Sequence, residues 1–323
     1  MCLRCCRISS GEGRYITAIN RSGGLGTEDR GQRTEDRGQR TEDRGQKTKD
    51  RIVTIKRFLT YAILIIGAVI MLLPFFWMVS TSFKAPQEVL SMPPKWFPSA
   101  LNFSNYIDAM KSAPFGMFFF NSVLVAIFNT VLQIVTAALA GYAFARLDFK
   151  FKNALFLFFL GTMMIPMEVI LVPNYMLLKY LGMHSTYFAL IIPWAASVFG
   201  IFLVRQFVLS LPKELFESAE IDGCTHWQIL WKIVFPSAKP VFISVGIFSL
   251  IGSWNSFLWP LIMTDSESMR TIPVGLAYFS AEFSTRYHLM MAAAVLSILP
   301  IILIYFFAQK QFVEGIATSG IKN

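Results

Sequence analysis

Six long apolar stretches are the feature of this sequence that most restricts its fold. They lie at residues 58–82, 116–145, 153–173, 186–205, 239–262 and 288–308. A helix of about 20 apolar residues crosses the hydrocarbon core of a bilayer, and most of these stretches reach that length. Of the 323 residues, 54% are hydrophobic and 15% are charged. The sequence therefore predicts an all-α membrane protein with six transmembrane helices.

Lysine and arginine predict the orientation of these helices. With the N-terminus in the cytoplasm, twelve basic residues lie inside: Arg51, Lys56, Arg57, Arg146, Lys150, Lys152, Arg205, Lys213, Lys232, Lys239, Lys310 and Lys322. Six lie outside: Lys84, Lys95, Lys111, Lys179, Arg270 and Arg286. Because cytoplasmic loops carry the excess of basic residues, this distribution predicts that both termini are cytoplasmic.

A polar segment, residues 211–240, separates the fourth apolar stretch from the fifth and is predicted to be cytoplasmic. Its first half predicts a short helix with Ser210 as the N-cap and Pro212 in the first turn, where no backbone N–H is required. Gly223 is expected to end this helix, because glycine adopts the left-handed conformation without a Cβ penalty.

The second half of the segment predicts another helix. Thr225 and Gln228 have the spacing of a capping box, in which each side chain satisfies a backbone donor. Pro236 and Pro240 are expected to limit the helix, because the residue before a proline disfavours helical geometry. The segment thus predicts a helix–glycine–helix unit.

One set of residues in this segment carries a family resemblance: Glu217, Ser218, Ala219, Gly223, Ile233, Phe235 and Pro236. They follow the pattern E-A-A-x3-G-x9-I-x-L-P, and in them the chain resembles the membrane subunits (permeases) of ATP-binding-cassette (ABC) importers. Ser218 and Phe235 depart from the pattern but keep its small and its large apolar type. The string PKELFESAEIDG is similar to the carbohydrate branch, the maltose-type second permease. The resemblance covers roughly Ile52 to Asn323.

The resemblance implies a type I ABC importer permease fold for residues 52–323. It implies as partners a cytoplasmic ATP-binding-cassette ATPase dimer, a second and different permease, an extracytoplasmic sugar-binding protein and the lipid bilayer of a prokaryotic cytoplasmic (inner) membrane. The loop at 211–240 is expected to couple to the ATPase through Glu217, Ser218, Ala219, Asp222, Gly223, Ile233 and Pro236. ATP would be bound by the partner, so no cofactor and no metal are expected in this chain.

Two apolar stretches contain candidate residues of a translocation path. Ser122, Asn129, Gln133 and Thr136 share one face of the second stretch, and polar groups do not face lipid, so this face is expected to point into the bundle. This polar face either forms hydrogen bonds between helices or lines a translocation path.

In the fifth stretch, Asn255 and Trp259 could contact a neutral sugar. The alternative is helix packing, with Trp259 in the aromatic belt.

The third stretch contains an acidic residue, Glu168, between Pro166 and Pro173. Its place between two prolines favours the outer interface or a re-entrant bend over a role in proton transport.

Residues 1–51 differ from the rest of the chain. A seven-residue repeat starts at Thr27, Thr34 and Thr41, and no apolar residue occupies any of its positions, so no coiled-coil seam is expected. The composition predicts disorder, and we favour a start site placed upstream of the true one. Cys2, Cys5 and Cys6 lack a fourth ligand at related spacing, which argues against a metal site.

Several function classes do not fit the sequence. It has no Gly-Lys dipeptide, hence no P-loop for ATP, and no converging catalytic set that would indicate an enzyme. No basic face with interleaved aromatic residues indicates nucleic-acid binding. The favoured function is a permease that imports a sugar or oligosaccharide with a separate ATPase. The alternatives are a secondary carrier or channel without an ATPase, although five of the six stretches lack internal charged or histidine residues, and a membrane scaffold.

Overall fold

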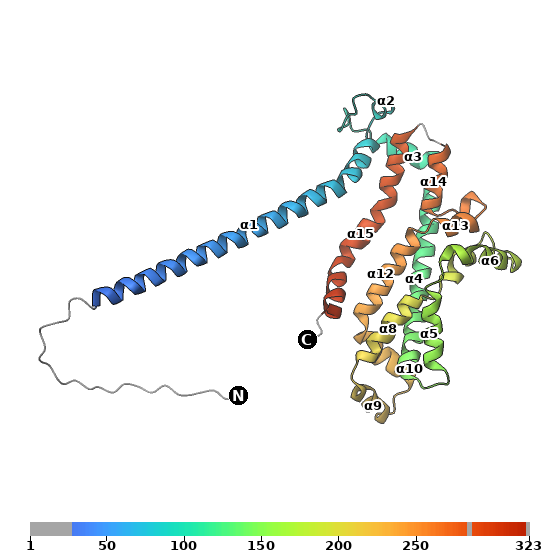
Figure 1. The fold of residues 1–323 in the computed structure, drawn as a ribbon. Coiled ribbons are helices and arrows are strands. Elements are labelled where there is room, and N and C mark those ends of the chain that lie inside the picture. Colours follow the sequence, from blue (N-terminus) through green and yellow to red (C-terminus); the bar gives the residue numbers. More distant parts are fainter. Residues whose placement is uncertain (1–27, 283–285, 321–323) are drawn as a thin grey trace, which may run out of the picture. The chain divides into compact units, whose positions relative to one another are not determined.

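The computed structural model describes residues 28–282 and 286–320, and every regular element within these ranges is a helix (Figure 1). The chain divides into two compact units, Met1–Leu72 and Leu73–Asn323. Cys2, Cys5 and Cys6, and the first 27 residues of the predicted extension, lie outside the described ranges.

The first helix, α1 (Glu28–Ser82), contains the first predicted span as Thr54–Ser82. It begins inside the seven-residue repeat, so residues 28–51 are helical where we expected no regular structure. The repeat is rich in glutamate, arginine and glutamine, whose intrinsic helix propensity is high, and this offsets the glycine in each repeat. The domain boundary at residue 51 stays a prediction.

The remaining helices follow in chain order. They are α2 (Pro86–Val89), α3 (Ser104–Ser112), α4 (Phe115–Arg146), α5 (Lys152–Thr162), α6 (Met167–Tyr180), α7 (Tyr187–Ile191), η1 (Ile192–Trp194), α8 (Val198–Ser210), α9 (Lys213–Ile221), α10 (His226–Ile229), η2 (Leu230–Val234), α11 (Phe235–Ser237), α12 (Lys239–Trp254), α13 (Leu258–Met263), η3 (Glu267–Met269), α14 (Ile272–Glu282) and α15 (Tyr287–Gly320).

Four segments of the described chain are long and apolar enough to cross a membrane: Thr54–Ser82, Phe115–Arg146, Tyr187–Ser210 and Tyr287–Phe306. Two bent helix pairs raise the number to six if each pair is one span. The predicted total of six therefore depends on the two pairs.

The third predicted stretch, 153–173, is not one straight helix. Helix α5 ends at Thr162, α6 begins at Met167, and the two meet at 99°. Pro166 precedes α6 with extended backbone angles. A proline has no N–H to donate the hydrogen bond that would continue α5, which agrees with the break. Glu168 is exposed in the first turn of α6, directly after this bend, and its place at the outer interface or in a re-entrant bend stays a prediction.

The fifth predicted stretch, 239–262, is also interrupted. Helix α12 ends at Trp254, and α13 begins at Leu258. Pro260 in the first turn of α13 has no backbone N–H and cannot continue α12, which accounts for the break. At its other end α12 meets the helical run His226–Ser237 at 79°.

Helix α4 is central to the unit that begins at Leu73, and it packs against α8 and α12. Small residues permit a close approach: a Cβ on Gly141 of α4 would lie 2.7 Å from the Cβ of Val204 in α8. Ala137 and Ala138, on the same helix, are fully buried. The backbones of α4 and α8 are therefore almost in contact at Gly141.

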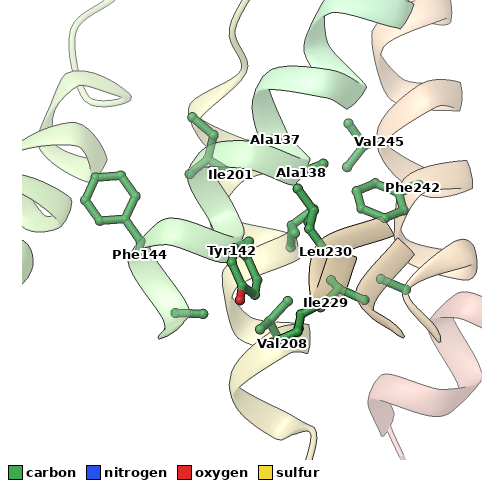
Figure 2. Packing of buried hydrophobic residues seen from close by; sticks show 14 of the residues in the cluster. Ala137, Ala138, Tyr142, Phe144, Ile201, Val208, Ile229, Leu230, Phe242 and Val245 are labelled. Carbon is green, nitrogen blue, oxygen red and sulfur yellow. The ribbon is translucent and has the colours of Figure 1, made fainter. Parts of the chain in front are cut away.

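The polar segment contributes to this core. Figure 2 shows Ile229 and Leu230 of the segment beside Tyr142 of α4 and Val208 of α8, all within one cluster of buried residues. The predicted cytoplasmic segment is thus attached to the bundle through apolar packing.

Candidate functional site

Gly223 forms the junction of the polar segment. Its φ is +77°, the left-handed conformation that was expected from the sequence. The N–H of Gly223 donates to the carbonyl of Glu220 at 3.0 Å, and the N–H of Cys224 donates to the carbonyl of Ala219 at 2.9 Å. These two bonds form a Schellman motif, which satisfies carbonyls at the end of α9.

The second helix begins with the capping box that was expected. The N–H of Thr225 donates to Oε1 of Gln228 at 2.8 Å, and the N–H of Gln228 donates to Oγ1 of Thr225 at 3.4 Å. The prediction for Ser210 is wrong: it is the last residue of α8, and its hydroxyl donates to the carbonyl of Phe207. Pro212 occupies the cap position of α9 instead.

Pro236 does not end the second helix. The helical run continues from His226 to Ser237, with a π-helical turn at Leu230–Val234 directly before the proline. The wider turn accommodates a residue that cannot donate a hydrogen bond and whose ring crowds the preceding turn. Pro240 lies in the first turn of α12, so it begins a helix, as expected of a proline at that position.

The polar segment has two faces. The inner face consists of apolar residues buried against α4 and α8: Phe216, Ala219, Ile229, Leu230 and Val234. The outer face consists of exposed residues: Glu217, Ser218, Asp222, Gly223 and Pro236. Ile221 and Trp227 are 86% and 60% exposed, although both are large and apolar.

The candidate coupling residues are accordingly divided between the two faces. Ala219 is buried, Ile233 is half-buried, and the others are exposed. The inner face of the segment therefore packs against the bundle, whereas its outer face exposes large apolar side chains to solvent.

Arg146, the last residue of α4, joins the segment to the bundle. Its Nη2 donates to the carbonyls of Val208 at 3.3 Å and Leu211 at 3.1 Å, and its guanidinium carbon lies 3.5 Å from the centre of the Phe216 ring. From the sequence, Arg146 is predicted only to be one of the cytoplasmic basic residues. Its partners lie 62 and 65 residues further along the chain, so no local pattern in the sequence indicated this role.

The polar stripe of α4 faces the other helices, as expected. Ser122 accepts from the N–H of Ile272 at 2.8 Å, and Gln133 donates to the carbonyl of Trp194 at 2.8 Å. Thr136 donates to the carbonyl of Ala195 at 2.9 Å, and Asn129 donates to Oγ of Ser253 at 3.1 Å. Each of these residues therefore bonds to a part of the chain outside α4.

A cavity of about 320 Å³ lies among α4, η1, α8, α12 and α13. Asn129 and Gln133 line it, whereas Ser122 and Asn255 do not. Asn255 is exposed at the end of α12. Trp259 is 2% exposed, lines the cavity and donates to the carbonyl of Ala189, so it packs among the helices and is not on the exposed surface that an aromatic belt requires.

In the described ranges, no group of three or more histidine, cysteine, aspartate or glutamate residues could hold a metal ion. Cys224 is a free thiol in the polar segment.

Comparison with known proteins identifies the family. Residues 133–318 match the model of the "binding-protein-dependent transport system inner membrane component". The arabinooligosaccharides transport system permease protein AraQ of Bacillus subtilis is 35% identical, over 78% of this chain and 91% of AraQ. The sulfoquinovosyl glycerol transport system permease protein SmoH of Agrobacterium fabrum is 31% identical, over 83% of this chain and 93% of SmoH.

A solved structure has the same fold. It is a chain of a bacterial ABC transporter involved in the import of the acidic polysaccharide alginate, with a TM-score of 0.72. The match covers 81% of this chain and 97% of that one at 24% identity. Such permeases are transport subunits and not themselves enzymes. This chain therefore belongs to the binding-protein-dependent transport system inner membrane components, the multi-pass permease subunits of ABC importers.

Proposed function

We propose that this chain is the permease subunit through which an ABC importer moves a sugar or oligosaccharide across a prokaryotic cytoplasmic membrane. Relatives that are more than 30% identical over most of the chain carry the names of arabinooligosaccharide and sulfoquinovosyl glycerol systems. The string PKELFESAEIDG, which resembles the carbohydrate branch, supports the same substrate class. ATP is bound by a partner ATPase, and this chain needs no cofactor.

The observation that carries the proposal is the two-faced polar segment. Its buried residues attach it to α4 and α8, and its outer residues, including Glu217, Asp222 and Gly223, are available to the ATPase. Ile221 and Trp227 supply exposed apolar area for the same contact. A movement of the ATPase surface therefore reaches the bundle through Phe216, Ala219 and the half-buried Ile233.

The remaining partners in this proposal are those that the family resemblance implies. The segment faces a cytoplasmic ATPase dimer, both termini are cytoplasmic, and an extracytoplasmic sugar-binding protein approaches the opposite side. A second, different permease completes the path in the bilayer. The basic residues at the segment's end of the bundle, Arg146 and Arg205, agree with that orientation, because basic residues are in excess on the cytoplasmic side.

Asn129 and Gln133 are the residues of this chain that we assign to the translocation path. Both line the cavity between the helices, and both are uncharged amides that bond to neighbouring elements. Ser122 bonds to the backbone of Ile272, and Asn255 lies at an exposed helix end, so both have structural roles in this proposal.

Co-purification tests the proposal. The chain, tagged at its C-terminus and extracted from its native membrane in mild detergent, is expected to retain an ATP-binding subunit and a second permease, identified by mass spectrometry. Uptake of sugars in a deletion strain is expected to return with the gene and to require ATP rather than a proton gradient. Uptake that depends on the proton gradient, without an associated ATPase, would instead support a secondary carrier.

A further inference from the structure

The cavity among α4, η1, α8, α12 and α13 has the walls of a small-molecule site. Its volume of about 320 Å³ lies at the lower end of the range of about 300–1,000 Å³ for such sites. Its walls come from elements separated by more than a hundred residues, including α4 and α13. A cavity of this size accommodates one unit of a longer ligand.

Two pairs of aromatic side chains line this cavity. Trp194 and Trp259 meet edge to face with ring centres 5.8 Å apart, and Phe199 and Phe248 meet in the same way at 5.7 Å. Such rings present flat apolar faces with partial negative charge, which match the C–H face of a sugar ring. The indole N–H of Trp259 is held by the carbonyl of Ala189, so this ring has a fixed orientation.

The polar residues of the wall carry only amides and hydroxyls. They are Asn129, Gln133, Ser197, Ser249, Ser253 and Ser256. Sugar hydroxyls both donate and accept hydrogen bonds, and amide and serine groups do the same.

Two of these residues keep unused hydrogen-bonding capacity. In the part of the chain that the structure describes, Oδ1 of Asn129 and Oγ of Ser249 are covered and have no hydrogen-bond partner. Asn129 is 3% exposed and Ser249 is 7% exposed. Buried polar groups are normally paired, and rotation of either side chain toward the cavity provides a partner once a ligand occupies it.

The wall carries no charge. None of the described residues that line the cavity is acidic, basic or histidine. A carboxylate or sulfonate that entered it would lose its water without gaining a cation, and the cost of burying an unpaired charge is large. The cavity therefore favours uncharged sugars over acidic ones such as uronates.

We infer that this cavity is a subsite in this subunit for one neutral sugar unit of the transported substrate. The inference rests on the proposed function and adds a location and a charge class to it. Asn129 and Ser249 supply hydrogen bonds, Trp194 and Trp259 supply the apolar platform, and Gly252 leaves the space open, since nothing lies within 4 Å of a Cβ placed there.

Two substitutions test the subsite in the complete importer, reconstituted with its ATPase, second permease and binding protein. Gly252→Met fills the cavity and is expected to abolish uptake of neutral probes such as arabinotriose and maltotriose. Gly116→Met is the matched control, because Gly116 is also an exposed helical glycine with nothing within 4 Å, and it lies away from the cavity. It is expected to leave uptake unchanged.

Ser249→Ala removes one oxygen and carries the test even if Gly252→Met fails to insert. It is expected to raise the apparent KM for neutral probes roughly three- to tenfold, the loss of one hydrogen bond, at an unchanged amount of complex. If the hydroxyl were only an unpaired group in the packing, its removal would be neutral or stabilising and KM would stay the same.

Selectivity provides the third measurement. The unsubstituted importer is expected to take up the neutral trisaccharides and to reject trigalacturonate. Normal uptake by Gly252→Met and an unchanged KM for Ser249→Ala would overturn the subsite while leaving the importer proposal intact. Equal uptake of trigalacturonate would overturn its charge class. Absence of ATP-dependent uptake of every probe would overturn the proposed function and the subsite with it.

Discussion

The guanidinium of Arg146 lies over the ring of Phe216, with 3.5 Å between the guanidinium carbon and the ring centre. Arg146 ends α4, whereas Phe216 lies in the middle of α9, on the buried face of the polar segment. This contact joins the predicted ATPase-binding segment to the central helix of the bundle.

Removal of this contact should separate ATP hydrolysis from transport. Arg146→Gln loses a cation–π contact worth about 1–2 kcal/mol. It also loses the two hydrogen bonds that Nη2 donates to the carbonyls of Val208 and Leu211. We expect the six spans to insert and the ATPase to remain bound, while sugars transported per ATP hydrolysed fall several-fold. Lys150→Gln removes the same charge from an exposed residue in the loop after α4 and serves as the control. Equal coupling ratios in the two variants would contradict the role of Arg146.

Gly223→Asp tests the outer face of the segment. At φ +77° any Cβ costs about 1–2 kcal/mol, yet nothing within the chain lies within 4 Å of it. We therefore expect insertion to be normal and transport to fall steeply, with the ATPase released or no longer stimulated by substrate. Glu217→Ala, which removes one exposed charge, should have a smaller effect.

Gly182 provides a matched control for this substitution. It also has a left-handed φ, +69°, with nothing within 4 Å, but it follows α6 and not α9. Gly182→Asp therefore introduces similar backbone strain and the same charge elsewhere, and coupled hydrolysis should survive. If Gly223→Asp keeps coupled hydrolysis at the level of the unsubstituted protein, the segment is not the coupling element.

Glu88 predicts a pH dependence for the segment after α1. Hydrogen bonds from Ser99, with further contributions from Lys95, hold the pKa of Glu88 below its ordinary value. A lowered carboxyl pKa stabilises the folded segment above the unfolded pKa, and this contribution is lost as the pH falls through the folded pKa.

We accordingly expect the hydrogen-exchange protection factors of residues 86–99 to fall below about pH 4, near the ordinary range of a glutamate. Glu88→Gln should show the lower protection factors already at pH 7 and little change in them on acidification. Unchanged protection factors in both proteins across this range would show that Glu88 does not hold the segment.

Deletion of residues 1–51 should leave membrane insertion and transport unchanged, because none of the repeat positions carries an apolar side chain. Uptake and membrane abundance of the shortened chain provide the measurement, and lost uptake at normal abundance would contradict the expectation. Mass spectrometry of the native N-terminus tests the upstream start site separately, since a peptide spanning Thr27 to Lys47 would refute it.

Local chemistry made part of this structure predictable. Gly223 and the pair Thr225 and Gln228 form hydrogen bonds with residues only a few positions away. The local sequence is therefore enough to predict the helix end and the helix start that they form. The apolar stretches were predictable for a similar reason, since span length is set by the bilayer rather than by neighbouring helices.

Features that depend on distant contacts were not predictable in the same way. The third and fifth stretches contain prolines that permit either a kink or a break, and packing against other helices decides between them. The fixed orientation of Trp259 depends on Ala189, 70 residues away. Arg146 was missed because its partners belong to α8 and α9.

The close approach of Gly141 and Val204 determines how a movement of the segment reaches the rest of the bundle. The side chain of Val204 packs directly against the backbone of Gly141, so a translation of α4 along α8 would produce a steric clash. A rotation of both helices as one body keeps this contact. Helix α4 is about 48 Å long. At its opposite end Asn121 holds the carbonyls of Ser268 and Arg270. A displacement of α9 is therefore expected to rotate α4 as a rigid body and to move the loop at the opposite end of α4 with it.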